Sequence, residues 1–242
     1  MTTGRIHSWD LSTGVDGPGT RFVLFLSGCP LRCLYCANPD TWHMRDGERV
    51  TADDVESRIE RYRRFTDMAG GGVTLTGGEP LLQSAFTAEV LQRCKGLGLH
   101  TALDTSGALG ARADDALLAD TDLVLLDVKS FDAGVYRRLT GGRVAPTLGF
   151  AARLNRLGVP VWIRYVLVPG WTDDAAAVDG LARFLGDLDN VDRVDVLPFH
   201  ELGAAKYDAL GIPFPLRDNP VPDDELVERV REQFRAHGLR AL

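Results

Sequence analysis

The chain has 242 residues, 45% of them hydrophobic and 25% charged, a composition typical of a globular protein large enough to bury a sizeable core. Its 34 acidic residues outnumber 27 basic ones and give a formal charge of -7. Such a surface repels phosphate backbones, so we do not expect broad nucleic-acid binding.

Neither a leader nor a membrane segment is expected. Met1–Asp10 lacks the apolar core of a signal peptide, and the densest apolar run, Phe22–Leu26, is far too short to cross a bilayer. We therefore expect a cytoplasmic protein, in a compartment where thiols stay reduced. There, four cysteines indicate metal binding or catalysis rather than a disulfide framework.

Short β-rich runs alternate with segments of helical periodicity along the whole chain. The first is a buried strand at Arg21–Gly28, and a helix follows at Thr51–Phe65 with a capping box between Thr51 and Asp54. Further strands are predicted at Gly72–Thr76, His100–Thr105, Asp122–Val128, Pro160–Val168 and Val191–Leu197. Further helices are predicted at about 86–97, 114–119, 148–157, 173–185 and 223–237.

Six strands alternating with helices predict an α/β fold with a parallel sheet, formed as one domain over residues 1–242. A doubly wound sheet and an incomplete barrel both satisfy this pattern. In either, residues that directly follow the strands gather at one functional edge. The polar candidates at these strand ends are Cys29–Cys36, Gly77–Glu79, Asp104–Thr105, Asp127–Lys129 and His200.

The spacing Cys-x3-Cys-x2-Cys, formed by Cys29, Cys33 and Cys36, follows the first predicted strand. Thiolates suit iron–sulfur clusters, copper(I) or zinc, and structural zinc usually needs a second cysteine pair. Cys94 lies on an apolar helical stripe and is interpreted as a buried hydrophobic residue. Three cysteines on a four-iron cluster leave one iron open for a substrate or cofactor. A zinc site completed by His43, or three unliganded thiols, remain alternatives.

This spacing, with Tyr35 just before the last cysteine, resembles the signature of the radical S-adenosylmethionine (SAM) superfamily. A longer set of stretches resembles one family within it, the enzymes that activate pyruvate formate-lyase, a glycyl radical enzyme. The stretches are Gly4–Ser8, Val15–Gly19, Cys33–Cys36, Gly70–Thr74, Trp162–Tyr165, Val168–Trp171 and His200–Gly203. The resemblance covers nearly the whole chain and implies a partial (β/α)6 TIM-like barrel, the radical SAM fold.

The resemblance also implies the chemistry. A 4Fe-4S cluster on the catalytic residues Cys29, Cys33 and Cys36 would cleave SAM to methionine and a 5′-deoxyadenosyl radical, which takes a hydrogen atom from a glycine of the partner. The implied cofactor-binding residues are Tyr35, Cys36, Ala37, Gly77, Gly78, Glu79, Asp104, Asp127, Val128, Lys129 and His200. The family often has histidine where Ala37 stands, so only a backbone role carries over there. It often has alanine in place of Pro80.

The resemblance further suggests a monovalent cation, Na+ or K+, at Asp104, Thr105 and Asp127. Carboxylates beside the carboxylate of SAM would repel each other unless a cation intervened. In the alternative interpretation, helix N-termini satisfy these carboxylates. Asp16 and Arg164 are the candidate contacts with the partner's glycine loop.

Pyruvate formate-lyase is the implied protein substrate, and flavodoxin or ferredoxin the expected electron donor, because no flavin motif or second cluster is visible. A monomer that is sensitive to oxygen is expected. Three alternatives stay open: an activator of another glycyl radical enzyme, a radical SAM enzyme acting on a small molecule, and a non-catalytic electron carrier. The stretch Ala37–Thr76 contains no cysteine, so the cysteine-rich insert found in many other activators is absent.

Overall fold

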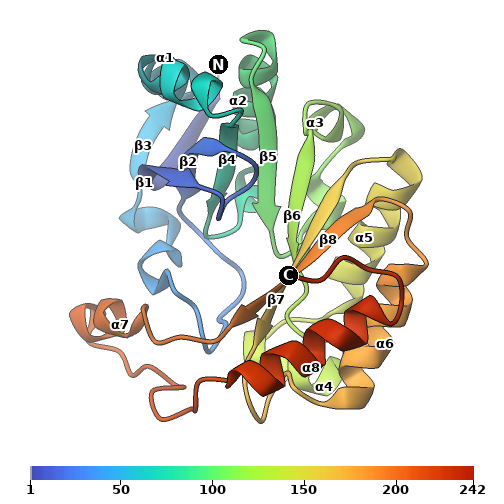
Figure 1. Cartoon of the computed structure of the whole chain (residues 1–242). Coiled ribbons are helices and arrows are strands. Elements are labelled where there is room, and N and C mark those ends of the chain that lie inside the picture. Colours follow the sequence, from blue (N-terminus) through green and yellow to red (C-terminus); the bar gives the residue numbers. More distant parts are fainter. Residues whose placement is uncertain (1) are drawn as a thin grey trace. The chain divides into compact units, whose positions relative to one another are not determined.

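The computed structural model describes residues 2–242 (Figure 1). Its strands are β1 (Thr3–Thr13), β2 (Thr20–Leu26), β3 (Glu48–Thr51), β4 (Gly72–Gly77), β5 (His100–Thr105), β6 (Leu123–Asp127), β7 (Val161–Leu167) and β8 (Val191–Pro198). Its helices are α1 (Ala52–Met68), α2 (Ser84–Gly96), α3 (Asp115–Ala119), α4 (Ala133–Thr140), α5 (Ala145–Leu157), α6 (Ala175–Gly186), α7 (Ala204–Leu210) and α8 (Asp224–Arg235). The strands pair in the order β3-β1-β2-β4-β5-β6-β7-β8.

Two compact units divide the described chain. The first contains residues 2–30, Asp40–Thr105 and Leu109–Leu125, and the second contains Leu31–Pro39, Ser106–Ala108 and Leu126–Leu242. Strand β6 begins in the first unit and ends in the second. The single domain expected from the sequence stays a prediction.

The first unit contains the predicted parallel strands that start the chain's α/β pattern. β2 pairs in parallel with β4, and β4 with β5. The capping box of α1 is confirmed, because the Thr51 hydroxyl accepts from the Asp54 amide while the Asp54 carboxylate accepts from the Thr51 amide. This reciprocal cap fixes where α1 begins, and α1 then packs against α2.

The six predicted strands are confirmed as β2, β4, β5, β6, β7 and β8, but two strands that were not predicted, β1 and β3, extend the sheet. β1 pairs antiparallel with β2, and β3 pairs antiparallel with β1. β1 lacks strict two-residue alternation because its register with β2 shifts between Ile6 and Ser8, as at a β-bulge. β3 has four residues, too few for a periodic pattern to be recognised.

The second unit contains the predicted strands β7 and β8 and the predicted helices α5, α6 and α8. β7 pairs in parallel with β8, and α6 and α8 lie side by side (Figure 1). α5 ends at Leu157, and Gly158 caps it with a left-handed φ of 66°, a conformation that glycine adopts readily. α4 and α7, with 8 and 7 residues, were missed because two turns give little periodicity to detect.

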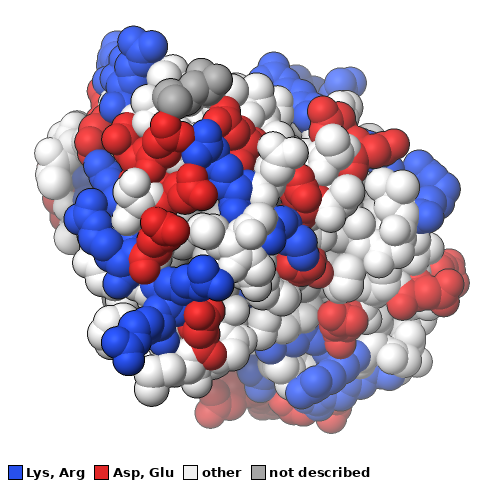
Figure 2. All heavy atoms as spheres, turned by 90° about the horizontal axis from the view of Figure 1, so that it is seen from above, with Lys and Arg blue, Asp and Glu red and all other residues white. Residues whose placement is uncertain are grey.

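One face of the molecule carries charges of both signs (Figure 2). Figure 2 shows a face on which Lys and Arg side chains are interspersed with Asp and Glu, without one broad basic area. The expectation against nucleic-acid binding, which rests on the formal charge of -7, stays a prediction. Among residues 2–242, no helix combines the length and apolar character that a membrane span needs.

Arg21, at the start of β2, is fully buried and ties the turn between β1 and β2 to β4. Its guanidinium donates to the Thr74 hydroxyl at 2.5 Å, to the Pro18 carbonyl at 3.3 Å and to the Val73 carbonyl. The Thr74 hydroxyl in turn donates to the Asp16 carbonyl at 2.6 Å. Burial lowers the pKa of Arg21 to about 10, so the side chain stays cationic at neutral pH.

Replacing Arg21 with methionine is expected to lower the free energy of unfolding by about 3 kcal/mol, because buried carbonyl oxygens lose their donor. Urea unfolding followed by circular dichroism measures the loss. The control is Arg61→Met on the exposed face of α1, which should stay within about 0.5 kcal/mol of wild type. An unchanged midpoint for Arg21→Met would contradict the anchoring role.

Candidate active site

The predicted site residues are divided between the two units, and each unit is described by itself. The first unit holds Asp16, Cys29, Gly77, Gly78, Glu79, Asp104 and Thr105. The second unit holds Cys33, Tyr35, Cys36, Ala37, Asp127, Val128, Lys129, Arg164 and His200.

In the first unit, the Gly77–Glu79 turn lies against the backbone that leads to Cys29. The Gly78 amide donates to the Leu26 carbonyl and the Glu79 amide to the Gly28 carbonyl, both at 2.8 Å. A Cβ atom on Gly78 would lie 2.3 Å from the Gly28 oxygen, so this approach requires glycine. The predicted motif and the start of the cysteine loop are therefore brought together at the carboxyl end of β2.

The carboxyl ends of β4 and β5 are joined by two hydrogen bonds between side chains. The Thr76 hydroxyl donates to the Asp104 carboxylate at 2.7 Å, and the Thr105 hydroxyl donates to the Glu79 carboxylate at 2.6 Å. Glu79 is 0% exposed, and it also accepts from the Leu81 amide at the start of the short helix Pro80–Gln83. The structure thus gathers Glu79, Asp104 and Thr105 at one edge, as the strand-end rule predicts.

Asp16 lies at the other end of the first unit's sheet. It belongs to the turn before β2, whereas Cys29 follows the end of that strand. At about 3.3 Å per residue, the 7 residues of β2 separate the two strand ends by roughly 20 Å. Within this unit, Asp16 is therefore not brought to the predicted cluster ligand.

In the second unit, the C-terminal end of α4 holds the cysteine turn. The Arg32 amide donates to the Thr140 carbonyl and the Leu34 amide to the Leu139 carbonyl, both at 2.9 Å. These carbonyls belong to the last turn of α4, where they have no partner within the helix. A hydrogen bond of 3.1 Å from the Cys36 amide to the Cys33 carbonyl closes the turn itself.

This role of α4 was not predicted, although its boundaries carry recognisable signals. Asp132 caps the first turn by accepting from the Val135 amide at 2.6 Å, and Gly141 ends the helix at a φ of 73°. An Asp before the helix and a Gly–Gly pair after it are ordinary start and stop signals. Gly142 also leaves room for Leu31, since a Cβ atom there would lie 2.6 Å from the Leu31 side chain.

Lys129 brings a positive charge near the cysteine turn. Its ammonium lies 2.9 Å from the Asp127 carboxylate and 5.6 Å from the centre of the Tyr35 ring. Burial opposes the charged form of both partners, but their attraction prevails. It raises the pKa of Lys129 well above its usual value and lowers the pKa of Asp127.

The same ammonium acts on the Cys33 thiol. Loss of hydration raises the pKa of Cys33 to about 11, and the charge of Lys129 opposes that rise. A thiol must lose its proton to bind iron. Lys129 therefore favours the form of Cys33 that a metal requires, besides neutralising Asp127.

The segment that follows β8 packs on the cysteine turn. A Cβ atom on Gly203 would lie 2.9 Å from the Cys36 carbonyl oxygen and 3.0 Å from the Ala37 Cα atom. Nearby, Lys206 donates to the Asn38 side chain at 2.8 Å. His200 belongs to the same segment and is exposed. It lies three residues before Gly203, which contacts Cys36 and Ala37.

Val128 and Arg164 meet through their backbones. The Val128 amide donates to the Arg164 carbonyl at 3.1 Å, so the end of β6 is held to the middle of β7. Burial raises the pKa of Asp127, but the charges of Lys129 and Arg164 outweigh it and lower that pKa. Arg164 is therefore placed with the Asp127–Lys129 group in the second unit.

The donor set suits an iron–sulfur cluster by its chemistry. Within residues 2–242 none of the four cysteines forms a disulfide, and no three His, Cys, Asp or Glu side chains form a ready-made metal site. Cys29, Cys33 and Cys36 fit such a cluster because they offer three soft thiol donors. Hydrogen bonds hold the backbone of their loop at Gly28 and again at Arg32 and Leu34. Cys94 is 1% exposed, and burial raises its pKa to about 12, as expected for an inert core residue.

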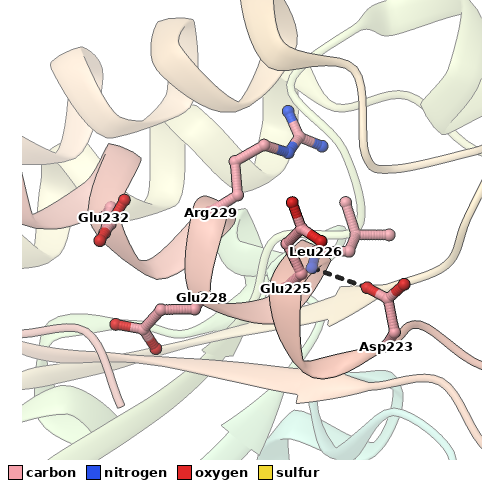
Figure 3. Close-up of a pocket in the computed structure, with 6 residues that line it drawn as sticks. All are labelled: Asp223, Glu225, Leu226, Glu228, Arg229 and Glu232. Atoms are coloured by element: carbon pink, nitrogen blue, oxygen red, sulfur yellow. Dashed lines mark hydrogen bonds between the residues drawn. The ribbon is translucent and has the colours of Figure 1, made fainter.

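A surface hollow along α8 contains none of these residues. Its volume is about 480 Å³, and it is lined by Asp223, Glu225, Leu226, Glu228, Arg229 and Glu232 (Figure 3). Several of these side chains stabilise the helix: Asp223 caps it by accepting from the Leu226 amide at 2.8 Å, and Glu228 pairs with Arg231 and Arg235. Asp223 and Glu228 are therefore accounted for by helix capping and ion pairing.

Comparisons with known proteins agree with the chemistry of the cysteine turn. The sequence model of the Radical SAM superfamily matches residues 23–179. The Pyruvate formate-lyase 1-activating enzyme of Escherichia coli (strain K12) is 43% identical over 242 residues, which cover 99% of this chain and 98% of the relative. The Pyruvate formate-lyase-activating enzyme of Staphylococcus aureus (strain USA300) is 45% identical over 235 residues, 94% of each chain.

A solved structure also matches. It is a domain of pyruvate-formate lyase-activating enzyme from Bacteroides vulgatus ATCC 8482, with a TM-score of 0.61 and 27% identity. The match covers 71% of this chain and 98% of that one. The strand order, the strand-end residues and these matches agree, and the chain belongs to the radical SAM superfamily and, within it, to the family of pyruvate formate-lyase-activating enzymes.

Proposed function

We propose that this protein activates pyruvate formate-lyase by generating a radical on one of its glycines. The observation that carries the proposal is the identity of 43–45% over nearly the full length of two enzymes named for that activity. Cys29, Cys33 and Cys36 would hold the 4Fe-4S cluster. When bound and reduced, that group supplies the electron that splits SAM into methionine and the 5′-deoxyadenosyl radical, which removes a hydrogen atom from the partner's glycine.

The chain's own residues bind and orient SAM in this proposal. Backbone carbonyls of Gly77–Glu79 accept from the methionine ammonium, since the glycines let a ligand approach the backbone closely. Tyr35 and Ala37 border the adenine, and Val128 contributes backbone beside Lys129. Lys129 and His200 approach the carboxylate and the ribose. The protein thereby orients the reactive bond and excludes competing reactions.

We further propose a monovalent cation, Na+ or K+, held by Asp104, Thr105 and Asp127. The proposal is supported by charge: the Asp104 and Asp127 carboxylates would repel the carboxylate of SAM unless a cation lay between them. Asp127 already has the Lys129 ammonium 2.9 Å away, so a cation would chiefly serve Asp104. SAM cleavage after exhaustive desalting, repeated with each alkali ion, tests this site. Rates indifferent to every alkali ion would contradict it.

The partner's glycine loop is proposed to contact Asp16 and Arg164. Asp16 stands in the turn before β2 beside Val15, which is 64% exposed. Because that turn lies at the opposite end of β2 from Cys29, Asp16 would serve docking rather than the chemistry. Reduced flavodoxin or ferredoxin would deliver the electron to a cytoplasmic monomer under anaerobic conditions.

A non-catalytic electron carrier is the alternative from another class. To distinguish the two functions, the reconstituted protein is incubated with dithionite and SAM without oxygen, and the products are analysed by chromatography. The proposed enzyme yields 5′-deoxyadenosine, whereas a carrier leaves SAM intact. Release of 5′-deoxyadenosine with no radical on pyruvate formate-lyase would instead favour an activator of another glycyl radical enzyme or an enzyme acting on a small molecule.

A further inference from the structure

The backbone pairing between β4 and β5 ends before the predicted site begins. The register runs from Gly72 opposite His100 to Leu75 opposite Leu103. The site residues that follow on each strand therefore lie beyond the paired segment. There the two strand ends are joined by side chains, through the Thr76–Asp104 hydrogen bond of 2.7 Å and the Thr105–Glu79 hydrogen bond of 2.6 Å.

The Glu79 carboxylate is enclosed rather than presented to a ligand. It is 0% exposed, and one of its oxygens accepts from both the Thr105 hydroxyl and the Leu81 amide. A carboxylate is costly to bury unless hydrogen bonds compensate for its lost hydration. With no exposed surface, the Glu79 side chain instead holds the backbone of the turn through these hydrogen bonds.

The backbone of the same turn is fixed on its other side. The Gly78 and Glu79 amides donate to the Leu26 and Gly28 carbonyls at 2.8 Å. The Gly77–Glu79 turn is thus held by β2 through its backbone and by β5 through the Glu79 side chain. Removing the second link would take away this bond between the turn and β5.

We propose that Glu79 and Thr105 are positioning residues, whose hydrogen bond sets the Gly77–Glu79 backbone and Asp104 in the arrangement that binds the methionine end of SAM. This inference rests on the proposed function. It assigns the Glu79 side chain to β5 and leaves only its backbone for the cofactor. None of the cysteines takes part in the bond, so we expect the cluster to assemble without it.

Thr105→Val removes the hydroxyl with little change in shape. We expect the Kd for SAM to rise about 10- to 100-fold, because a hydrogen bond to a charged group is lost. The Kd is read from the change in the electron paramagnetic resonance spectrum of the reduced cluster during SAM titration. KM for SAM should rise in parallel, with a smaller change in kcat, while iron and sulfide contents stay at the wild-type level.

Three variants make the result specific. Thr105→Ser keeps the hydroxyl and should restore SAM binding. Glu79→Asp, whose carboxylate is one methylene too short to reach Thr105, should weaken binding as Thr105→Val does, and it serves if Thr105→Val does not fold. Thr121→Val removes a buried hydroxyl that donates to the Leu117 carbonyl at 2.8 Å and should bind SAM as wild type does.

Because Thr105 is also a proposed cation ligand, Glu79→Asp decides the test: the inference is overturned if this variant binds SAM with wild-type Kd, or if both variants lose the cluster together with SAM binding. The second outcome would mean that the bond supports the fold in general. Failure of the proposed function is a different result, since the wild-type protein would then show no spectral change with SAM.

Discussion

Replacing Cys33 with alanine is expected to abolish SAM cleavage and glycyl radical formation. Cys33 is one of only three thiols in the loop after β2, and its loss leaves two thiol ligands for the cluster. The measurement is iron and sulfide content after anaerobic reconstitution, followed by detection of 5′-deoxyadenosine. Both should fall to the level of a sample without protein.

The matched control is Cys94→Ala. Cys94 is 1% exposed in α2 and takes no part in the loop, so its replacement should cost about 1 kcal/mol of stability. Cluster content and SAM cleavage should match wild type. A Cys33→Ala protein with a full complement of iron and wild-type cleavage would refute the assignment of the cluster ligands.

Replacing Lys129 with methionine is expected to lower both stability and SAM cleavage. The variant leaves the Asp127 carboxylate, 21% exposed, without its ammonium partner at 2.9 Å. Breaking a buried charge pair at one partner costs about 3 kcal/mol, which urea unfolding measures. SAM cleavage should fall at least about 30-fold, because the lost charge also faces the cofactor in the proposed function.

A second substitution separates these two effects. In Lys129→Met/Asp127→Asn both charges are gone, so most of the stability should return. SAM cleavage should remain low, because neither charge is available to orient the cofactor. Wild-type stability in Lys129→Met alone would contradict the pairing, and recovery of cleavage in the double variant would show that Lys129 acts on Asp127 only.

The parallel α/β core could be predicted from the sequence because its strands and helices have distinct periodicities. β2 is an apolar run, and the Thr51–Asp54 capping box marks the start of α1. The antiparallel strands β1 and β3 could not be recognised in the same way. A bulge interrupts β1, and β3 is four residues long, so tertiary pairing rather than local pattern makes them strands.

The candidate site was predictable where it depends on strand ends. Glu79, Asp104 and Thr105 meet at one edge of the first unit, as the parallel topology requires. What the sequence could not give is the set of partners. That Lys129 pairs with Asp127, and that the last turn of α4 holds the cysteine turn, depends on packing between segments distant in the chain.

Electron paramagnetic resonance on pyruvate formate-lyase tests the central claim most directly. The reconstituted protein is reduced without oxygen and mixed with SAM and pyruvate formate-lyase. The account predicts the spectrum of a glycyl radical on pyruvate formate-lyase, its appearance matched by 5′-deoxyadenosine and absent with the Cys33→Ala variant. Release of 5′-deoxyadenosine without that radical, or no cleavage of SAM at all, would contradict it.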